Sequence, residues 1–253
     1  MVNKLDNPEF YRSQEEEKIR NEFFEHFKEC PIPDREILQN LGLFLTSKNL
    51  SRILFMNHIY QQIVDVHGVV IEFGTRWGQN ISVFSALRGI YEPFNRNRKI
   101  IGFDTFTGFQ NISEKDNPKC SLINEGSFSC TDNYEEYLEK VLEFQEKDNP
   151  LSHIKKFELR KGDATVEIEK YFSDHPETIV ALAFFDLDIY VPTKKCLEVI
   201  KPHLVKGSLL AFDELNDADC PGETTALDEV LGLNNVRLKR YPFTSRISYF
   251  IYD

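Results

Sequence analysis

The sequence lacks the long apolar runs and paired cysteines that mark membrane proteins and disulfide-rich proteins. No stretch approaches the roughly 18 uninterrupted apolar residues of a membrane-spanning helix. Residues 1–36 are polar and charged and contain no apolar segment typical of a secretion signal. The five cysteines are odd in number and include no CxxC pair, which disfavours a disulfide scaffold or a zinc knuckle. We therefore expect a cytoplasmic protein that does not associate with membranes.

Basic residues are also in short supply. The chain has 30 Lys and Arg against 41 Asp and Glu, which gives a formal net charge of −11. A sequence-independent nucleic-acid binder needs an excess of positive charge to replace phosphate counterions, and anionic membranes attract basic segments. The acidic balance therefore argues against both kinds of partner. A length of 253 residues with 41% hydrophobic and 28% charged residues is typical of a soluble globular protein.

From residue 68 onward, short apolar runs alternate with helical patterns. The runs predict strands at 68–74, 99–106, 155–164, 178–188 and 207–215. This alternation predicts a doubly wound, mostly parallel α/β sheet with helices on both faces. Two further strands near 236–241 and 246–253 have no helical pattern between them. They complete seven strands and predict an antiparallel hairpin at the sheet edge.

The N-terminal part of the chain has a different pattern. Apolar residues at helical spacing predict helices over 13–29 and, with a break near residues 46–49, over 34–66. We expect residues 1–66 to form a helical segment attached to a catalytic domain at 67–253. The apolar faces of these helices are candidates for a homodimer interface. Together with the long polar segment 107–132, they are also candidates for the lid and walls of an acceptor site.

Acidic residues follow every strand of the predicted parallel sheet. These residues are Glu72, Asp104, Asp163, Asp186 with Asp188, and Asp213 with Glu214. Ligands of open α/β sheets bind beyond the carboxyl ends of the strands. Chance placement on a solvated rim explains two or three such acids, whereas five in register indicate a functional edge.

The loop after the first strand points to the class of cofactor. Gly74 and Gly78 suit a tight turn at a helix N-terminus that a ligand approaches closely. The chain has neither GxGxxG nor GxxxxGK[ST], which disfavours dinucleotides and nucleoside triphosphates. Asp104 lies 26 residues after Gly78, near the spacing at which an acid meets ribose hydroxyls. A cofactor with a ribose but no pyrophosphate fits these facts, and S-adenosylmethionine is such a cofactor.

Six motifs occur in order between residues 68 and 230. They read IEFGTRWGQN, IIGFDTFTGF, RKGDA, FFDLDIYVPT, KGSLLAFDEL and PGETTALDE. This set resembles the class I S-adenosylmethionine-dependent methyltransferases, which have a Rossmann-like fold. More narrowly, it is similar to the macrocin O-methyltransferase (TylF-like) family, which methylates sugar hydroxyls. The DxDxYxPT and PGET motifs are fairly specific, whereas the glycine loop supports only the class.

The resemblance implies cofactor contacts, a magnesium site and a base. The implied cofactor-binding residues are Glu72, Gly74, Arg76, Gly78, Asp104, Thr105, Phe106, Asp163, Ala164 and Asp186. The implied magnesium ligands are Asp186, Asp213 and Glu214, although the family commonly has Asp-Asp where this chain has Asp213-Glu214. Carboxylate oxygens suit magnesium, which can stabilise a developing alkoxide. Asp186 is the first choice for the base that takes the hydroxyl proton, and Asp188 is the second.

Four possible functions are compared with these sequence features. The preferred function is methyl transfer from S-adenosylmethionine to a hydroxyl of a sugar, nucleotide-sugar or glycoside, with magnesium. A nicotinamide-dependent oxidoreductase would use the same fold but should show GxGxxG. A metal-dependent hydrolase could use the clustered carboxylates but would not need Asp104 or Asp163. A catalytically inactive binding protein on the same fold also remains open.

Overall fold

The computed structural model describes residues 13–116, 123–244 and 246–253. Three stretches lie outside the described residues. They are residues 1–12 of the expected N-terminal segment, residues 117–122 of the expected acceptor-side segment, which include Cys120, and residue 245. Within the described ranges, no helix is long and apolar enough to cross a membrane.

The described strands form one seven-stranded sheet. They are β1 (Val69–Phe73), β2 (Ile100–Asp104), β3 (Phe157–Lys161), β4 (Val180–Phe185), β5 (Leu204–Phe212), β6 (Lys239–Arg240) and β7 (Ser248–Ile251). The strand order is β3-β2-β1-β4-β5-β7-β6, with parallel pairing from β3 to β5 and antiparallel pairing of β7 with β5 and β6. The predicted doubly wound sheet with an antiparallel edge hairpin is confirmed.

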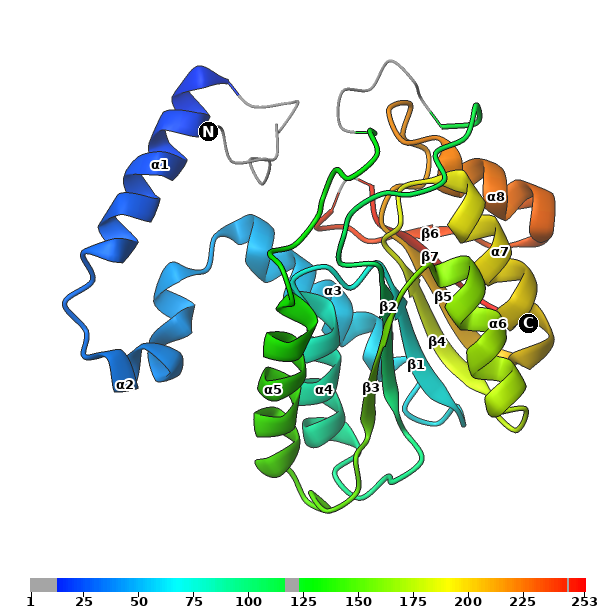
Figure 1. Cartoon of the computed structure of the whole chain (residues 1–253), viewed down its shortest axis with the longest axis horizontal. Helices are drawn as coiled ribbons and strands as arrows, with labels where there is room; N and C mark the ends of the chain where they lie inside the picture. The colour runs from blue at the N-terminus through cyan, green and yellow to red at the C-terminus, as the bar shows by residue number, and fades with distance from the viewer. Residues whose placement is uncertain (1–12, 117–122, 245) are drawn as a thin grey trace.

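Helices cover both faces of this sheet (Figure 1). One face carries α3 (Ser47–Gln61), α4 (Gln79–Tyr91) and α5 (Tyr134–Lys147), and the other carries α6 (Ala164–Asp174), α7 (Tyr190–Ile200) and α8 (Gly222–Val230). Neighbouring residues of β4 show the alternation that produces two cores. Phe184 packs with the α3 and α4 side chains, whereas Phe185 stacks on Phe212, with ring centroids 4.7 Å apart, in the core beneath α6–α8. Both faces of β4 are buried, as its continuous apolar run predicts.

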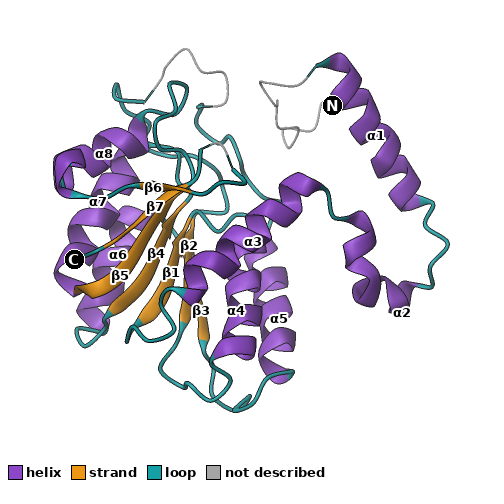
Figure 2. Ribbon diagram, turned by 180° about the vertical axis from the view of Figure 1, so that it is seen from behind, coloured by secondary structure: helices purple, strands orange, loops and turns teal. Residues whose placement is uncertain are grey.

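An N-terminal arm precedes the sheet and extends away from it (Figure 2). It consists of α1 (Gln14–Lys28), α2 (Asp34–Ile37) and the 3₁₀ helix η1 (Leu38–Phe44). Ser13 and Glu16 form a capping box that satisfies amide groups at the start of α1. None of these three helices has a buried residue, whereas α3 packs into the core through side chains such as Phe55 and Ile59. The predicted second helical stretch is therefore three shorter helices, of which only the last joins the domain.

Two helices begin earlier than the sequence predicts. Helix α7 begins at Tyr190 rather than at Pro192, because the buried carboxylate of Asp116 accepts a hydrogen bond from the Tyr190 amide at 2.7 Å. Proline is tolerated there because the first amides of a helix have no intrahelical partner. Helix α8 begins at Gly222 rather than at Thr225. A Cβ atom at Gly222 would lie 2.4 Å from a carboxylate oxygen of Asp116, so the close packing of the two helix starts requires glycine.

A buried arginine fixes the end of α3 against the sheet. Arg98 is 1% exposed and donates to a carboxylate oxygen of Glu92 at 2.8 Å. The same guanidinium donates to the main-chain oxygens of Ile63 at 2.8 Å and Val66 at 2.7 Å. These carbonyls follow α3, and the Ile63 oxygen also accepts a hydrogen bond from the Val66 amide at 3.0 Å. The position of α3 matters because its other end carries a residue of the candidate site.

Candidate functional site

Acidic residues from all five parallel strands lie along one edge of the sheet. Glu72 belongs to β1, and Asp104 is the last residue of β2. Asp163 follows β3 and immediately precedes α6, and Asp186 and Asp213 directly follow β4 and β5. Because the strands are parallel, their carboxyl ends meet at this edge. The structure therefore brings together the five acids that the sequence pattern singled out.

The glycine loop packs directly against the end of β4. Gly74 has a φ of +89°, and a Cβ atom there would lie 1.9 Å from the main-chain oxygen of Asp186. Gly78 has a φ of +76° and immediately precedes α4. Such φ values strongly favour glycine, because it has no Cβ. The two glycines therefore let the loop pack closely against the end of β4 and against Leu138 of α5, next to the start of α4.

Glu72 is a fully buried carboxyl group at this edge. Neither of its oxygens has a hydrogen bond of good geometry among the described residues, although the Asn80 side chain lies close enough to oppose the rise of its pKa. Burial, helped by the negative charge of Asp186, raises the pKa of Glu72 well above its usual range. Leaving such a group poorly paired costs about 1–3 kcal/mol. A poorly paired buried acid beside a glycine loop fits a site that receives a positively charged ligand.

Asp104 joins the glycine loop to the segment after β2. One of its carboxylate oxygens accepts a hydrogen bond from the amide of Arg76 at 2.7 Å, and the other accepts one from the amide of Phe106 at 2.5 Å. Burial raises the pKa of Asp104, although these two amides oppose the shift. The Thr105 hydroxyl donates to the main-chain oxygen of Gly108 at 2.9 Å and thereby stabilises the turn. Each Asp104 oxygen retains a lone pair that could accept a ligand hydroxyl.

Asp163 has structural contacts that the sequence did not predict. It caps α6 by accepting hydrogen bonds from the amide and hydroxyl of Thr165 at 2.9 Å and 2.8 Å. Its second oxygen accepts a hydrogen bond from the Asn111 amide group at 2.9 Å. Asp163 thus connects β3 to the segment that follows β2. Ala164 is buried as the first residue of α6, and the adenine contacts expected of both residues stay predictions.

Arg52 of α3 enters the site and bridges two of its carboxylates. Its guanidinium contacts Asp186 at 2.5 Å and Asp213 at 3.0 Å, and its Nε donates to the Asn80 side-chain oxygen at 3.0 Å. The Asn80 amide also donates to Asp186, at 3.3 Å. The side chains of Arg52, Asp186 and Asp213 are 26%, 23% and 14% exposed. Opposite charges at these distances raise the pKa of Arg52, so the guanidinium stays charged.

The three expected magnesium ligands are each paired with an arginine. Arg52 already compensates Asp186 and Asp213, whereas Glu214 points to Arg246, with 2.6 Å between their charged atoms. Over residues 13–116, 123–244 and 246–253, no group of three or more metal-ligating side chains is assembled. Magnesium requires free carboxylate oxygens in near-octahedral arrangement. Here, an arginine contacts one oxygen of each of the three carboxylates.

Asp188 and Glu223 form the centre of the loop between β4 and α7. Asp188 has a φ of +60°, and its carboxylate accepts no hydrogen bond from the described residues. Burial, together with the charge of Asp213, raises the pKa of Asp188 to about 7. One oxygen of the fully buried Glu223 accepts hydrogen bonds from the amides of Leu187 and Asp188 at 3.2 Å and 3.4 Å. Its other oxygen accepts one from the amide of Glu214 at 3.2 Å. Glu223 therefore ties together the loops after β4 and β5.

The sequence interpretation missed three residues of this arrangement. Glu223 lies within the PGET motif, which was expected to supply a turn and a helix cap and, by the family resemblance, to lie near the acceptor, but Glu223 itself was given no role. Arg52 lies 134 residues from Asp186, and no motif surrounds it. Asp116 lies in the long polar segment, and its contact with Tyr190 joins positions 74 residues apart. The PGET motif was therefore the only signal for any of the three.

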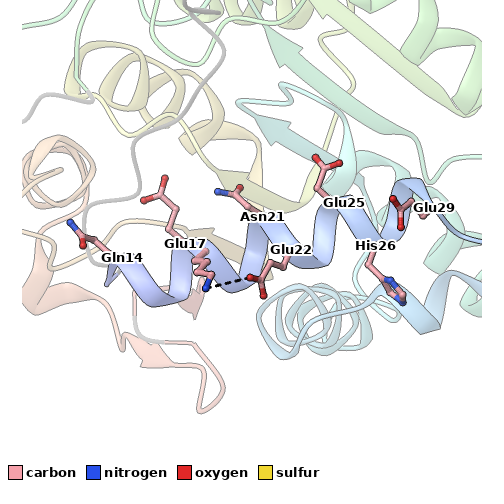
Figure 3. Close-up of a pocket in the computed structure, with 8 residues that line it drawn as sticks. Gln14, Glu17, Asn21, Glu22, Glu25, His26 and Glu29 are labelled. Atoms are coloured by element: carbon pink, nitrogen blue, oxygen red, sulfur yellow. Dashed lines mark ion pairs between the residues drawn. The ribbon is translucent and has the colours of Figure 1, made fainter.

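A separate hollow of about 570 Å³ lies along α1. Its lining residues all belong to this helix or its C-cap, Glu29 (Figure 3). The side chains are exposed, and an ion pair joins Lys18 to Glu22 at 3.7 Å. The hollow is the open polar face of one helix, so the candidate site remains the carboxyl edge of the sheet.

Comparison with known proteins gives strong matches to solved structures. A crystal structure of CalS11, a calicheamicin methyltransferase, is 38% identical over 98% of both chains, with a TM-score of 0.93. An apo structure of CalS11, a TDP-rhamnose 3'-O-methyltransferase of calicheamicin biosynthesis, is 37% identical over 96% of both chains, with a TM-score of 0.84. The O-methyltransferase NovP shares the fold at 14% identity over 79% of both chains, with a TM-score of 0.57. No protein-family model and no curated protein sequence matches the chain.

Proposed function

Because this chain belongs to the class I S-adenosylmethionine-dependent O-methyltransferases of the CalS11 type, we propose that its methyl acceptor is a sugar hydroxyl. CalS11 is a TDP-rhamnose 3'-O-methyltransferase, and its likeness to this chain extends over nearly all of both proteins. The structural observation that carries the proposal is the alignment of five acid-bearing strand ends at one edge of the sheet. A hydrolase would not need the contacts by which Asp104 joins the glycine loop to the segment after β2. The likeness to CalS11 does not favour an inactive binding protein.

The proposed cofactor site is built from the glycine loop, Glu72 and Asp104. S-adenosylmethionine supplies an activated methyl group on a positively charged sulfur. The buried and poorly paired Glu72 suits the positively charged methionine end of that molecule. Asp104 offers its oxygens to ribose hydroxyls, and the loop from Gly74 to Gly78 places main chain at the start of α4. Arg76 is the proposed partner of the cofactor carboxylate.

We propose Asp188 as the group that takes the proton from the acceptor hydroxyl. Asp186, the first choice from the sequence, has one carboxylate oxygen held by both Arg52 and Asn80, although burial and the charge of Asp213 raise its pKa. Among the residues that the structure describes, the Asp188 carboxylate has no such partner, and a pKa of about 7 suits a base that works near neutral pH. Glu223 holds the main chain of Asp188 in place. Asp186 then orients groups at the site through Arg52.

The magnesium requirement expected from the sequence stays a prediction. A dication at Asp186, Asp213 and Glu214 would require both Arg52 and Arg246 to leave their present positions. If magnesium binds there, its chemical contribution would be to stabilise negative charge on the acceptor oxygen. Magnesium titration of the parent chain and of Arg52→Met shows whether Arg52 competes with the ion for these carboxylates.

We also propose that the N-terminal segment and residues 107–132 form the acceptor side of the site. Arg52 already places one side chain of α3 against the catalytic carboxylates. The arm presents apolar side chains to solvent, and we propose these as a homodimer interface: Ile19, Phe23, Phe24, Phe27, Leu38, Leu41 and Leu43. Sedimentation velocity of the chain and of a Phe24→Glu variant tests this, because the variant should be monomeric. A monomeric parent chain would contradict it.

Two measurements test the proposed function. Thermal melting with S-adenosylmethionine, S-adenosylhomocysteine, NAD and magnesium added separately should show stabilisation by both adenosyl ligands and none by NAD. Absence of a shift with either adenosyl ligand would refute the methyltransferase assignment. Asp188→Asn should abolish methyl transfer and retain S-adenosylhomocysteine binding, whereas Asp186→Asn should retain partial transfer. The reverse order of losses would make Asp186 the base.

A further inference from the structure

Backbone strain gathers around the proposed cofactor site. A positive φ is unfavourable for residues other than glycine, because their Cβ atom comes too close to a main-chain oxygen, and Asn and Asp tolerate it best. Among the described residues, the other non-glycine positions with a positive φ are Arg76, Phe106, Phe128 and Leu151. The Asp104 carboxylate holds the first two through their amides. Phe128, with a φ of +64°, is the third such residue at this site, since its ring lies against Arg76.

Two aromatic rings from different segments lie against the Arg76 guanidinium. Its central carbon is 4.9 Å from the ring centre of Phe128 and 5.8 Å from the ring centre of Trp77. Both distances lie within the roughly 6 Å over which a ring face attracts a cation. Burial lowers the pKa of Arg76, whereas the nearby charges of Asp104 and Asp186 oppose this shift. The guanidinium therefore lies at the carboxyl edge of the sheet, beside the proposed cofactor residues.

Contacts on both sides of Phe128 hold its backbone in the strained conformation. The amide of Phe109 donates to the main-chain oxygen of Ser127 at 3.0 Å, and the amide of Cys130 donates to that of Phe106 at 3.0 Å. The rings of Phe109 and Phe128 also pack together, with centroids 5.1 Å apart. A strained residue persists only where its surroundings fix it, and such residues cluster at ligand-binding sites. Here, the fixed conformation places a half-buried ring on Arg76.

On the premise that the glycine loop, Glu72 and Asp104 bind S-adenosylmethionine, we propose that Phe128 is a positioning residue that holds the Arg76 guanidinium for the carboxylate of the cofactor. An arginine side chain has many rotamers, and ordering it on binding costs affinity. The Phe128 ring orders the cation before the ligand arrives, which reduces that cost. A ring face attracts the guanidinium without taking up its planar N–H donors, which a carboxylate requires.

The experiment compares calorimetric titrations of the full chain with S-adenosylhomocysteine and with methylthioadenosine. Both ligands have the adenosine and a thioether sulfur, but only S-adenosylhomocysteine has the amino-acid end with its carboxylate. Phe128→Leu keeps an apolar side chain but removes the ring. It should weaken S-adenosylhomocysteine binding about fivefold and leave methylthioadenosine binding unchanged. Phe128→Tyr keeps the ring and should bind both ligands like the parent chain. Phe94→Leu makes the control change at a side chain that is 74% exposed, and it should also bind like the parent chain.

A double variant connects the effect of the ring to the arginine. Arg76→Gln should also weaken S-adenosylhomocysteine binding and leave methylthioadenosine binding unchanged. Adding Phe128→Leu to Arg76→Gln should weaken S-adenosylhomocysteine binding no further, because the ring acts through the guanidinium. Losses that multiply in the double variant would refute the proposal.

The parent chain separates this inference from its premise. If it binds S-adenosylhomocysteine and Phe128→Leu binds that ligand equally well, the positioning role is refuted and the methyltransferase assignment stands. Equal weakening of both ligands by Phe128→Leu also refutes the positioning role, since it would show that the ring only supports the fold of the segment. If the parent chain binds neither ligand, the proposed function itself fails, and this inference fails with it.

Discussion

Removal of Arg52 has a consequence for stability that follows from its two ion pairs. Arg52→Met keeps the length of the side chain but leaves Asp186 and Asp213 as two partly buried like charges. Removing one partner from a buried ion pair costs about 3–5 kcal/mol. Because these side chains are 14–26% exposed, we expect the lower end, about 3 kcal/mol. For a domain of this size, that loss lowers the melting temperature by about 6–12 °C.

Urea unfolding of the parent chain and two arginine variants measures this loss. Arg240→Met is the matched control, since Arg240 is exposed and pairs with no carboxylate in the described ranges. It should change the free energy of unfolding by at most about 0.5 kcal/mol. Adding Asp213→Asn to Arg52→Met should recover about 1–2 kcal/mol, because one of the two unpaired charges is removed. Equal losses in the two arginine variants, or no recovery in the double variant, would refute the bridging role.

The same variant decides how magnesium relates to these carboxylates. In the parent chain, Arg52 occupies oxygens of Asp186 and Asp213, so magnesium should raise the melting temperature little. In Arg52→Met the carboxylates are free, and magnesium should stabilise the fold measurably more. Equal stabilisation of both proteins would show that Arg52 does not compete with the ion.

Three further predictions concern buried carboxyl groups. Burial raises the pKa of Glu72 in the folded chain above its unfolded value, so the parent chain loses stability as pH rises above about 4.5. Glu72→Gln removes this loss. In urea unfolding, the variant should be more stable than the parent chain by about 1–3 kcal/mol at pH 8 and equally stable at pH 4. It should also bind S-adenosylhomocysteine more weakly. Equal stabilities at pH 8 would contradict this. Glu223→Gln removes an acceptor for the Glu214 amide and should lower the methyl-transfer rate about tenfold while changing cofactor affinity less; a parallel fall in both would argue against a role in placing Asp188. Asp116→Ala removes the cap of α7 and should cost about 1–2 kcal/mol in thermal unfolding, whereas the exposed Glu114→Ala should cost nothing measurable.

The sequence predicted the sheet and its acidic edge because both follow from short-range patterns. Apolar runs such as 178–188 are long enough to be buried on both faces, and each is followed by a helical pattern. Parallel strands place their carboxyl ends at one edge, so Glu72, Asp104 and Asp186 had to lie near one another. Local chemistry and topology were sufficient for this part.

The contacts between these elements could not be predicted in the same way. Arg52 reaches Asp186 across 134 residues, and only the packing of α3 against the sheet decides that contact. The start of α8 depends on the space left by Asp116, which made Gly222 rather than Thr225 the first helical residue. The pairing of Asp186, Asp213 and Glu214 with two arginines from distant segments was not predicted, and the three-carboxylate magnesium site stays a prediction. Patterns within one element carry no information on such partners.

One measurement tests the central claim most directly. The chain is incubated with S-adenosylmethionine carrying a deuterated methyl group and with thymidine-diphosphate rhamnose, and the products are followed by mass spectrometry. The account predicts one labelled methyl group on a sugar oxygen, formed together with an equal amount of S-adenosylhomocysteine, and no product with Asp188→Asn. Label on a carbon or nitrogen atom would contradict the account. So would S-adenosylmethionine that binds but is not consumed with any nucleotide-sugar, free sugar or glycoside tested.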